Sequence, residues 1–454
     1  MACVCYALSA RIERPDCFSR ARTACAAALA GLLVFTVANG AMWSASATAR
    51  TDPAGASWRE AHAGLVGANV GGWLLAERWL TDRGQSALSV GALKSPYEIA
   101  GAEGAIDERS LSIRLRAAGR LDALDAWRDA YVTRADFAAM RAAGLNAVRV
   151  PFGWWLVART DDPDGYHRGK GLRYLDDAMR WAEAEGLEVV LDLHGAPGSQ
   201  NGRQTAGHEA APQWMPDHFD AERCVEVLEI VARRYAASRA LVGITLLNEP
   251  ELPMVILAPF YARAYAAVRA AGCAPSRVAV IINLYAMDAV LSDGWALNRL
   301  MPPSTHPNVI YDVHVYFAFM PLALHALLSL RTLTSVVVWV QAMAVHLSGR
   351  FCIIGEWSLR LPFAGTLAAE LDAMTPSRRD ALLREFGARQ LDAYGSQAGC
   401  VGVFFWTWNA PEHESMWSFQ RAVANGWLAP ARVSRLGARL RERAAPVGRG
   451  AGSE

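Results

Sequence analysis

Two short apolar runs of this chain each lead into residues that can carry acid–base chemistry. The run 243–247 continues into Asn248, Glu249 and a proline, and the run 351–355 continues into Glu356. Proline cannot continue the hydrogen bonding of a strand, so we expect Asn248 and Glu249 at the C-terminal tip of a buried strand. Two glutamates at two strand tips predict a pair of catalytic carboxylates. Ordinary strand-capping glutamates are the alternative interpretation.

Short apolar runs recur along the chain, and helical patterns, such as those at 175–184 and 221–237, lie between most of them. The runs lie at 64–69, 147–150, 188–193, 243–248, 278–283, 309–314, 351–356 and 402–406. Eight strands alternating with helices predict an α/β fold, a (β/α)8 TIM barrel, whose strand tips meet on one face. A doubly wound open sheet is the alternative, but it normally shows a glycine-rich phosphate turn after its first strand.

The composition fits one large enzyme domain. Of the 454 residues, 53% are hydrophobic, and the formal net charge is +1. This is not a disordered composition, and so small a charge argues against a nucleic-acid partner. We expect the catalytic barrel at 60–431, with a long insertion at 81–130 after the first strand, and an arginine-rich tail at 432–454. We also expect a monomer.

The first fifty residues read as a targeting segment rather than as part of the fold. Four arginines precede an uncharged stretch at 23–49, and Ala45, Ser46 and Ala47 fit a signal-peptidase site. The stretch is also long enough to span a bilayer. A cleaved signal and a type II membrane anchor therefore both remain open for 1–50. Either one predicts entry into the secretory pathway, with a secreted or extracellular protein as the first expectation and membrane association as the second.

The body of the chain keeps four cysteines whose spacings match no zinc site. An even number of cysteines in an oxidising compartment allows one or two disulfides, but the pairing cannot be read from the sequence. The four residues are Cys224, Cys273, Cys352 and Cys400.

An ordered set of polar and aromatic residues occupies the expected strand tips. From the first strand to the eighth the set includes Glu77, Arg149, His194, Asn248, Glu249, His314, Tyr316, Glu356 and Trp406. Together these motifs resemble glycoside hydrolases of family 5, in particular the branch of exo-β-1,3-glucanases. The resemblance extends from about residue 66 to about residue 430.

The resemblance implies a role for each of the two carboxyl groups. Cleavage of a glycosidic bond needs one carboxyl group to protonate the leaving oxygen and another to meet the developing positive charge on the sugar. Carried over from the family, Glu249 is the acid/base and Glu356 is the nucleophile of a retaining reaction. We expect an ionised Glu356 to raise the pKa of Glu249, so that Glu249 is protonated near neutral pH.

The resemblance also implies a substrate-binding set. Arg149 and Tyr316 would keep Glu356 ionised and oriented, and Asn248 would hydrogen-bond the sugar 2-hydroxyl. The histidines would bind hydroxyls or the acid/base, Trp406 would stack under the sugar, and Glu77 would bind a glucose hydroxyl. The set comprises Glu77, Arg149, His194, Asn248, His314, Tyr316, Phe319 and Trp406.

Each of these residues also has an ordinary structural interpretation. Arg149 could pair with any acid, and Trp406 could belong to the core. His194 and His314 could form a metal pair, but no acidic residue at ligand spacing supplies a third ligand. No cofactor or metal is therefore expected. Asp192, inside its strand, is interpreted as structural.

Two segments depart from the family pattern. Arg203 stands where the exo-β-1,3-glucanases commonly carry a phenylalanine that clamps the sugar, although the second clamp position is kept as Phe319. The stretch 319–347 contains a single formal charge, Arg331. It is either a buried barrel helix with its loop or an apolar lid for a membrane or lipid. These departures leave the leaving-group preference and the β-1,3 assignment open.

The sequence thus predicts a retaining hydrolase of β-glucosidic bonds in a glucan or glucoside, most simply an exo-β-1,3-glucanase. A β-glucosidase that acts on glucosylated lipids or sterols is the alternative within this chemistry. A barrel that binds glucan without cleaving it is the alternative of another class.

Overall fold

The computed structural model describes the greater part of the chain. The described residues are 52–81, 95–160, 163–210, 213–285, 294, 296–319, 350–361, 371–397 and 399–444. The expected targeting segment at 1–50 and the apolar stretch that follows Phe319 lie outside these residues.

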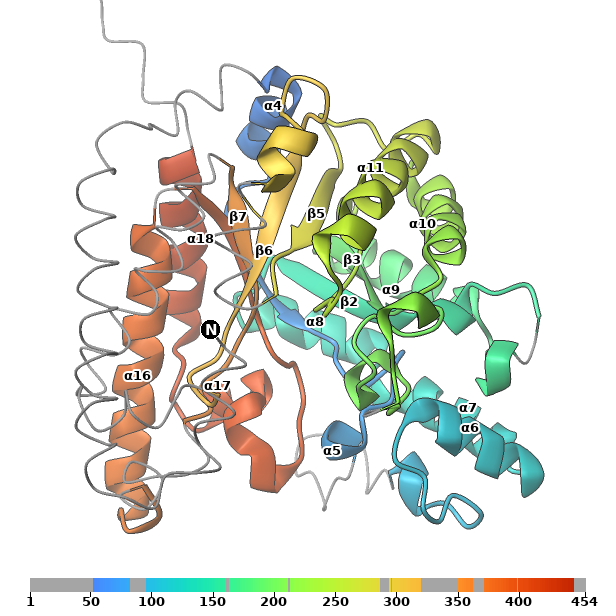
Figure 1. The fold of residues 1–454 in the computed structure, drawn as a ribbon. Coiled ribbons are helices and arrows are strands. Elements are labelled where there is room, and N and C mark those ends of the chain that lie inside the picture. Colours follow the sequence, from blue (N-terminus) through green and yellow to red (C-terminus); the bar gives the residue numbers. More distant parts are fainter. Residues whose placement is uncertain are drawn as a thin grey trace, which may run out of the picture.

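Eight parallel strands close into a barrel in which each strand pairs with the next and β8 pairs with β1 (Figure 1). The strands are β1 (Leu65–Asn69), β2 (Ala147–Gly153), β3 (Glu188–Gly195), β4 (Leu241–Thr245), β5 (Ala279–Asn283), β6 (Val309–Val315), β7 (Cys352–Trp357) and β8 (Cys400–Phe405). The predicted (β/α)8 barrel is confirmed. Each strand begins within three residues of the start of its predicted run.

The amino-terminal halves of the strands are held together by apolar side chains inside the barrel. Leu65, Val190, Ile281 and Ile310 belong to one buried cluster there. Trp58 joins this cluster and donates its indole N–H to the carbonyl of Val242 at 2.9 Å. Trp58 lies on α4 (Pro53–His62), which therefore packs on the barrel although it begins before residue 60.

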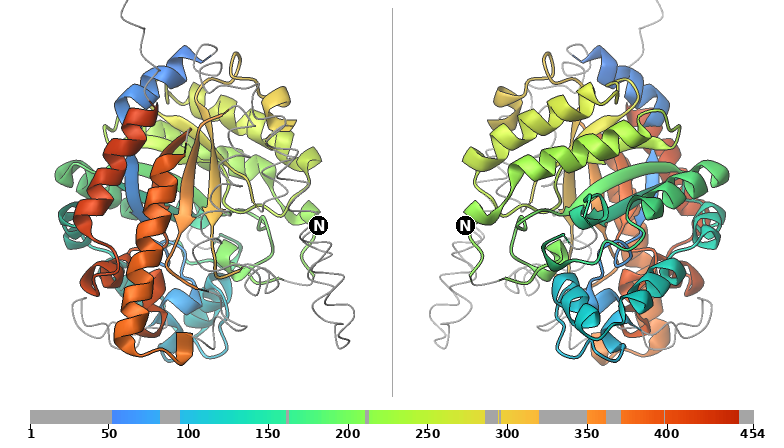
Figure 2. Two further views of the ribbon diagram at one scale, coloured as in Figure 1. Left: turned by 90° about the vertical axis from the view of Figure 1, so that its left-hand side faces the viewer. Right: turned by 90° about the vertical axis from the view of Figure 1, so that its right-hand side faces the viewer.

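Helices surround the barrel, and two of them, α16 and α18, lie side by side along it (Figure 2). The longer helices are α8 (Arg134–Ala142), α9 (Leu172–Glu185), α10 (Ala221–Tyr235), α11 (Met254–Ala270), α16 (Pro376–Ser396) and α18 (Pro430–Ala444). Figure 1 shows α4 at one end of the barrel and α6, α7 and α17 at the other. The latter end carries the carboxyl ends of the strands, because α6 and α7 follow β1 and α17 follows β8.

The described part of the insertion after β1 contains a short 3-10 helix, η1 (Pro96–Glu98), and two α-helices. The α-helices are α6 (Glu108–Ala117) and α7 (Leu121–Tyr131). Glu108 is fully buried and accepts hydrogen bonds from Arg128 Nη2 at 2.5 Å and from Trp155 Nε1 at 2.9 Å. The ion pair with Arg128 joins the two helices of the insertion, and the bond from Trp155 joins the insertion to the segment after β2.

The C-terminal boundary differs from the one that the arginine content indicated at 431/432. The helix α18 spans that boundary, and Val433, Leu436 and Leu440 are buried on its inner side. Arginines on its other faces pair with solvent-exposed acids, as Arg439 does with Asp392 at 3.0 Å. The helix is amphipathic, so a high arginine content marked only its outer face.

Two further expectations can be compared with the described residues. The four cysteines of the body are buried free thiols, so they form no disulfide with one another. Within the described ranges, no helix has the length and apolar character needed to cross a bilayer.

Candidate active site

Glu249 and Glu356 reach the carboxyl end of the barrel from different kinds of backbone. Glu356 lies inside β7, whereas Glu249 lies four residues beyond the end of β4. Glu249 has a left-handed backbone, with φ of 41°. The Asn283 side chain accepts the N–H of Glu249 at 3.2 Å, and the Asn201 amide donates to its carbonyl at 3.2 Å. These two bonds satisfy the backbone polar groups of an uncommon conformation.

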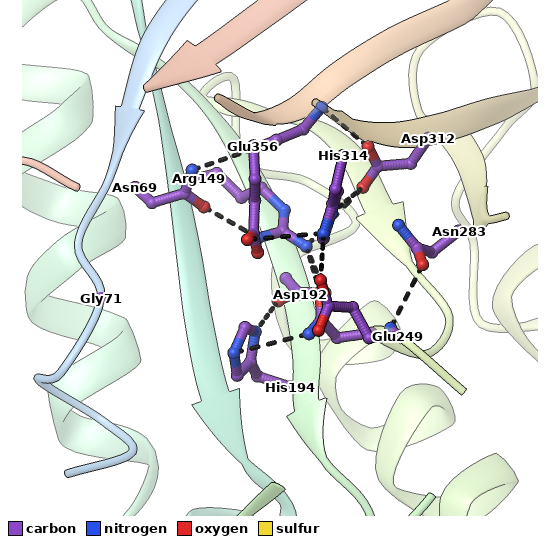
Figure 3. Close-up of polar contacts among 12 residues, drawn as sticks. Asn69, Gly71, Arg149, Asp192, His194, Glu249, Asn283, Asp312, His314 and Glu356 are labelled. Atoms are coloured by element: carbon purple, nitrogen blue, oxygen red, sulfur yellow. Dashed lines mark hydrogen bonds and ion pairs between the residues drawn. The ribbon is translucent and has the colours of Figure 1, made fainter. Parts of the chain in front are cut away.

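The two carboxyl groups face each other across a short gap that His314 fills (Figure 3). A carboxyl oxygen of Glu249, a carboxyl oxygen of Glu356 and a ring nitrogen of His314 all lie within 4.8 Å of one another. Inverting glycosidases need about 6.5–9.5 Å between their carboxyl groups to admit a water, whereas retaining enzymes hold them about 5–5.5 Å apart. The spacing matches the retaining arrangement.

Glu356 is buried and receives strong hydrogen bonds on both oxygens. Arg149 Nη1 donates to Oε1 at 2.9 Å, and the Tyr316 hydroxyl donates to Oε2 at 2.5 Å. His314 Nδ1 lies 3.4 Å from Oε2. Burial raises the pKa of Glu356 above its ordinary value, but the charges of His314 and Arg149 oppose that rise. These donors favour the ionised carboxylate and hold both of its oxygens in place.

Arg149 is fully buried and connects several strands at this end of the barrel. Its guanidinium donates to Asn69 Oδ1 and Asn248 Oδ1, each at 2.8 Å. It also lies 3.1 Å from Asp192 Oδ1 and 3.6 Å from Asp312 Oδ2. Burial alone would lower the pKa of Arg149, but the surrounding carboxylates raise it. A permanent positive charge is therefore fixed beneath the two glutamates.

His314 is the hydrogen-bond partner of the Glu249 carboxyl group. Its Nδ1 lies 2.6 Å from Glu249 Oε1, and its Nε2 lies 3.5 Å from Asp312 Oδ2. Burial would lower the pKa of His314, but the carboxylates of Glu356 and Asp312 and the bond to Glu249 raise it well above its ordinary value. His314 therefore holds a proton between two glutamates.

This proton changes the expected titration of Glu249. Burial raises the pKa of Glu249, but the hydrogen bond and positive charge of His314 outweigh that effect and lower it. The net pKa of Glu249 in the free protein is therefore lowered and not raised as expected, because His314 outweighs the groups that raise it. These directions favour the proton on His314, at hydrogen-bond distance from the Glu249 carboxyl group.

His194 and Trp406 form a stacked pair beside Asn248. Their ring centroids lie 5.3 Å apart, with an interplanar angle of 8°. His194 Nδ1 lies 2.7 Å from Asp192 Oδ2, and the Asn248 amide lies 3.5 Å from His194 Nε2. Gly71 supports the other side of Trp406, because a Cβ at this glycine would meet the indole at 2.8 Å. Both rings are therefore held in fixed orientations.

Glu77 is almost fully buried, with 2% of the residue exposed, and its pKa differs from that of an ordinary glutamate. Its Oε2 accepts the indole N–H of Trp79 at 2.9 Å. Burial, reinforced by Glu356 and Glu249 and opposed by His194 and Trp79, raises the pKa of Glu77 to about 7. The charges of Glu249 and Glu356 act on Glu77, and Trp79 contacts Trp417, which contacts Tyr316. Glu77 therefore belongs to the same site.

Phe319 belongs to an aromatic group at the edge of the site. Its ring lies 5.8 Å from that of Tyr316 and 6.3 Å from that of Trp417, while 68% of the residue is exposed. Trp417 in turn contacts Trp79, with centroids 5.4 Å apart. The structure thus brings all ten predicted site residues to the carboxyl end of the barrel.

Glu249, His314 and Glu356 also have the donor atoms of a metal site. In a tetrahedral zinc site with bonds of about 2.0–2.1 Å, neighbouring ligand atoms lie about 3.3 Å apart. His314 Nδ1 and Glu249 Oε1 are closer than this, at 2.6 Å. Their distance is that of a charge-assisted hydrogen bond, which needs no metal between the two atoms.

Comparison with known proteins identifies the group to which this site belongs. Residues 107–361 match the family model of the cellulases, glycosyl hydrolase family 5. A glucan 1,3-beta-glucosidase of Candida oleophila is 30% identical over 424 residues, which cover 85% of this chain and 93% of the relative. The chain belongs to glycosyl hydrolase family 5. It is therefore a glycoside hydrolase.

Other relatives of this glycoside hydrolase agree with the assignment. A probable glucan 1,3-beta-glucosidase A of Aspergillus niger is 31% identical over 392 residues, covering 79% of this chain and 86% of the relative. The crystal structure of a rutinosidase from Aspergillus niger superposes with a TM-score of 0.60 at 18% identity. That superposition covers 82% of this chain and 99% of the rutinosidase, and it supports the barrel fold.

Sequence reasoning missed three members of this family 5 site. Asn69, Asp192 and Asp312 all contact Arg149, although Asp192 was interpreted as structural and the other two were given no role. Asp192 and Asp312 each stand two residues before a histidine of the site. Because residues i and i+2 of a strand share a face, this repeated Asp-X-His pattern was an available signal.

Proposed function

We propose that this glycoside hydrolase is a retaining exo-β-1,3-glucanase, with Glu356 as nucleophile and Glu249 as acid/base. The observation that carries the proposal is the short separation of the two carboxyl groups, within 4.8 Å between their oxygens. Their environments differ in the way that the two roles require. Glu356 is buried under two strong donors, and Glu249 shares a proton with His314.

In the first step a Glu356 oxygen attacks the anomeric carbon as the bond from that carbon to the leaving oxygen breaks. The leaving oxygen takes a proton from Glu249, so that a glycosyl ester of Glu356 and a free sugar are formed. This proton passes from His314, whose Nδ1 lies 2.6 Å from Glu249 Oε1, to Glu249 and from there to the leaving oxygen. Formation of the ester removes the negative charge of Glu356, and with it one of the attractions that keep the proton on His314.

In the second step Glu249, now ionised, accepts a proton from water. The water oxygen attacks the anomeric carbon, the ester bond breaks, and the Glu356 carboxylate is restored. Two inversions leave the product with the β configuration of the substrate. The remaining predicted residues bind the sugar beside the nucleophile. They are Glu77, Arg149, His194, Asn248, His314, Tyr316, Phe319 and Trp406.

The choice of β-1,3-glucan rests on relatives. Two of them, at 30% and 31% identity, carry names that state glucan 1,3-beta-glucosidase activity. The apolar stretch that suggested a glucosylated lipid lies beyond the described residues, and the glucan-binding barrel without catalysis leaves the paired carboxyl groups unexplained. We further propose that residues 1–50 direct the chain into the secretory pathway and that the protein acts as a monomer.

Two experiments test the proposal. Release of glucose should be fastest from laminarin when laminarin, cellulose, pustulan and glucosylceramide are compared at equal glucosyl concentration. Proton NMR of the first product, taken before mutarotation, should show β-glucose. Early α-glucose would refute the double displacement, and preferred release from glucosylceramide would favour the lipid alternative.

For the targeting segment, an alkaline carbonate wash of membranes separates a cleaved from an anchored protein. Gel filtration coupled to light scattering measures the oligomeric state. A chain that starts near residue 51 should remain folded and active, and its unfolding would show that the segment is structural.

A further inference from the structure

An ion pair that the reaction described above does not use lies in the segments that follow β3 and β4, close to Glu249 in the chain. Arg203 Nη2 lies 2.6 Å from Glu251 Oε1. Their side chains are 55% and 32% exposed, so both remain accessible to a ligand. Arg203 lies beyond β3, and Glu251 lies two residues after Glu249 beyond β4. The pair therefore comes from two neighbouring strand ends.

Backbone and amide hydrogen bonds fix this pair relative to Glu249. The Arg203 N–H donates to Asn201 Oδ1 at 3.0 Å, and the Asn201 amide donates to the carbonyl of Glu249 at 3.2 Å. The Glu251 N–H donates to the carbonyl of Gln200 at 3.0 Å. Glu251 thus makes one of the bonds that join the two strand ends, and Arg203 lies two residues after Asn201, which makes another.

A third polar group comes from the next strand end. Tyr285 lies two residues after Asn283, whose side chain accepts the N–H of Glu249. Burial raises the pKa of the Tyr285 hydroxyl, and the carboxylates of Glu249 and Glu251 add to this effect while Arg203 opposes it. Tyr285 therefore lies within electrostatic reach of the ion pair and of Glu249.

We propose that Arg203 and Glu251 bind the leaving group and select one that is neutral and rich in hydroxyls, such as a sugar. This inference rests on the proposed function, because it takes Glu249 as the acid. The leaving oxygen must lie at hydrogen-bond distance from Glu249. Glu356 must face the sugar that forms the ester, so we place the groups that are joined to the backbone around Glu249 beside the leaving group.

The charges of the pair determine the chemical class of the ligand. Arg203 and Glu251 neutralise each other, so the pair has no net charge with which to attract an anionic or a cationic leaving group. A lipid chain laid over the pair would remove both charges from water without replacing their hydrogen bonds. A sugar can accept hydrogen bonds from the guanidinium and donate to the carboxylate, which keeps both groups satisfied.

The simpler explanation is that the pair only joins two loops. Exposed ion pairs contribute about 0–1 kcal/mol to stability, and many contribute nothing measurable. The test must therefore separate leaving-group binding from loop stability, and also from a change in the acidity of Glu249. Two substrates whose leaving oxygens both need protonation, but of which only one has hydroxyls on its leaving group, make both separations: a change in the acidity of Glu249 must slow the substrate with the more basic alkyl oxygen at least as much as the other.

Laminaribiose and n-octyl β-glucoside serve this purpose. Both need protonation of an alkoxide-like leaving group, but only laminaribiose offers hydroxyls beyond the cleaved bond. We expect Arg203→Ala and Glu251→Gln each to lower kcat/KM for laminaribiose about tenfold, as for the loss of hydrogen bonds to charged groups. For n-octyl β-glucoside, kcat/KM should stay within about twofold of the wild-type value. Arg203→Lys should recover part of the loss on laminaribiose.

Arg263→Ala is the matched control. Arg263 is 46% exposed and pairs with Glu222, but this pair joins the outer helices α11 and α10. Arg263→Ala should leave kcat/KM unchanged for both substrates. Equal losses on both substrates in Arg203→Ala would mean that Arg203 acts through Glu249, and no loss on laminaribiose would mean that it only joins loops. Either outcome overturns the inference, whereas a wild-type protein that cleaves neither substrate would overturn the proposed function itself.

Discussion

Glu356 and Glu249 are identical side chains with carboxyl oxygens less than 5 Å apart, but the chain surrounds them differently. Glu356 lies inside a strand, is 4% exposed, and receives hydrogen bonds from Arg149 and Tyr316. Glu249 lies in a segment beyond a strand, bonds to His314, and has a half-exposed ion pair two residues away. Because the residue type is the same, the two proposed roles follow from the different surroundings of the two carboxyl groups.

The difference follows from backbone geometry. Glu356 lies within a strand of the closed barrel and is paired with His314 of β6. Such a carboxylate can be held in a single orientation for attack. A residue beyond the strand can face both the sugar and the leaving group. It therefore suits proton transfer to an atom that moves away.

The largest expected effect comes from replacing the two carboxylates in turn. Glu356→Ala should reduce turnover of every substrate to background, because no glycosyl ester can form. Glu249→Ala should lose activity on laminarin but keep the first step on aryl glucosides, whose leaving groups need little protonation. Steady-state and burst kinetics on both substrates measure this contrast.

Azide provides the control for the assignment of roles. It should restore turnover of aryl glucosides in Glu249→Ala and yield β-glucosyl azide, since a small anion can attack the ester without a base. Glu356→Ala should not give this product. Equal losses on activated and unactivated substrates in both variants, without rescue, would reverse or remove the assignment.

The buried environment of Glu356 can be tested by replacing Arg149. Arg149→Met should lower the free energy of unfolding by about 3–5 kcal/mol, because it leaves buried carboxylates without their counter-charge. Urea unfolding measures the loss. Arg128→Met is the matched control, since Arg128 is equally buried and pairs with Glu108 in the insertion.

Both arginine variants should be destabilised, but only Arg149→Met should shift the acid limb of the rate profile to higher pH. Arg149 lies 2.9 Å from the carboxylate of Glu356, and its positive charge opposes the rise in the pKa of that group. An unchanged acid limb in Arg149→Met would show that Arg149 has only a structural role.

The fold could be predicted because its signals are local. A strand buried on both faces is a continuous apolar run, and all eight runs were visible in the chain. The two glutamates could be predicted because each follows or ends such a run. The boundary at α18 could not, because its arginines are more conspicuous than its three buried apolar side chains.

The network beneath the glutamates was less accessible to sequence reasoning. The partners of Arg149 come from β1, β3, β6, β7 and the segment after β4, and no local pattern reports which distant strands place side chains together. The two histidines also looked alike in the sequence. Only their neighbours distinguish His314, which bonds Glu249, from His194, which stacks on Trp406.

A smaller effect is expected at His314, which lies between Glu249 and Glu356. In the wild type the pair of Glu249 and His314 keeps its proton until the pH rises through the raised pKa of His314. In His314→Asn, Glu249 must hold the proton alone. The basic limb of kcat/KM should then move to lower pH, with about a 10- to 100-fold loss on laminari-oligosaccharides.

Aryl glucosides should lose less in His314→Asn, because their leaving groups need little protonation. Rate profiles on both substrates, measured between pH 4 and about 9, provide the comparison. A basic limb at the wild-type position would show that His314 does not hold the proton.

The smallest expected effect concerns Glu77, a buried carboxyl group of the site whose hydrogen-bond donor, Trp79, is uncharged. Its folded-state pKa of about 7 exceeds its ordinary value of 4.5, so the folded protein binds this proton more tightly than the unfolded chain does. The stabilisation from that proton is complete below about pH 4.5 and is lost as the pH rises through about 7.

Glu77→Gln keeps an acceptor for Trp79 but cannot ionise. It should raise the free energy of unfolding by about 2 kcal/mol at about pH 8 and leave it nearly unchanged at about pH 4.5. Urea unfolding at the two pH values measures the difference, and an equal effect at both would show that Glu77 has the same charge in the folded and unfolded protein.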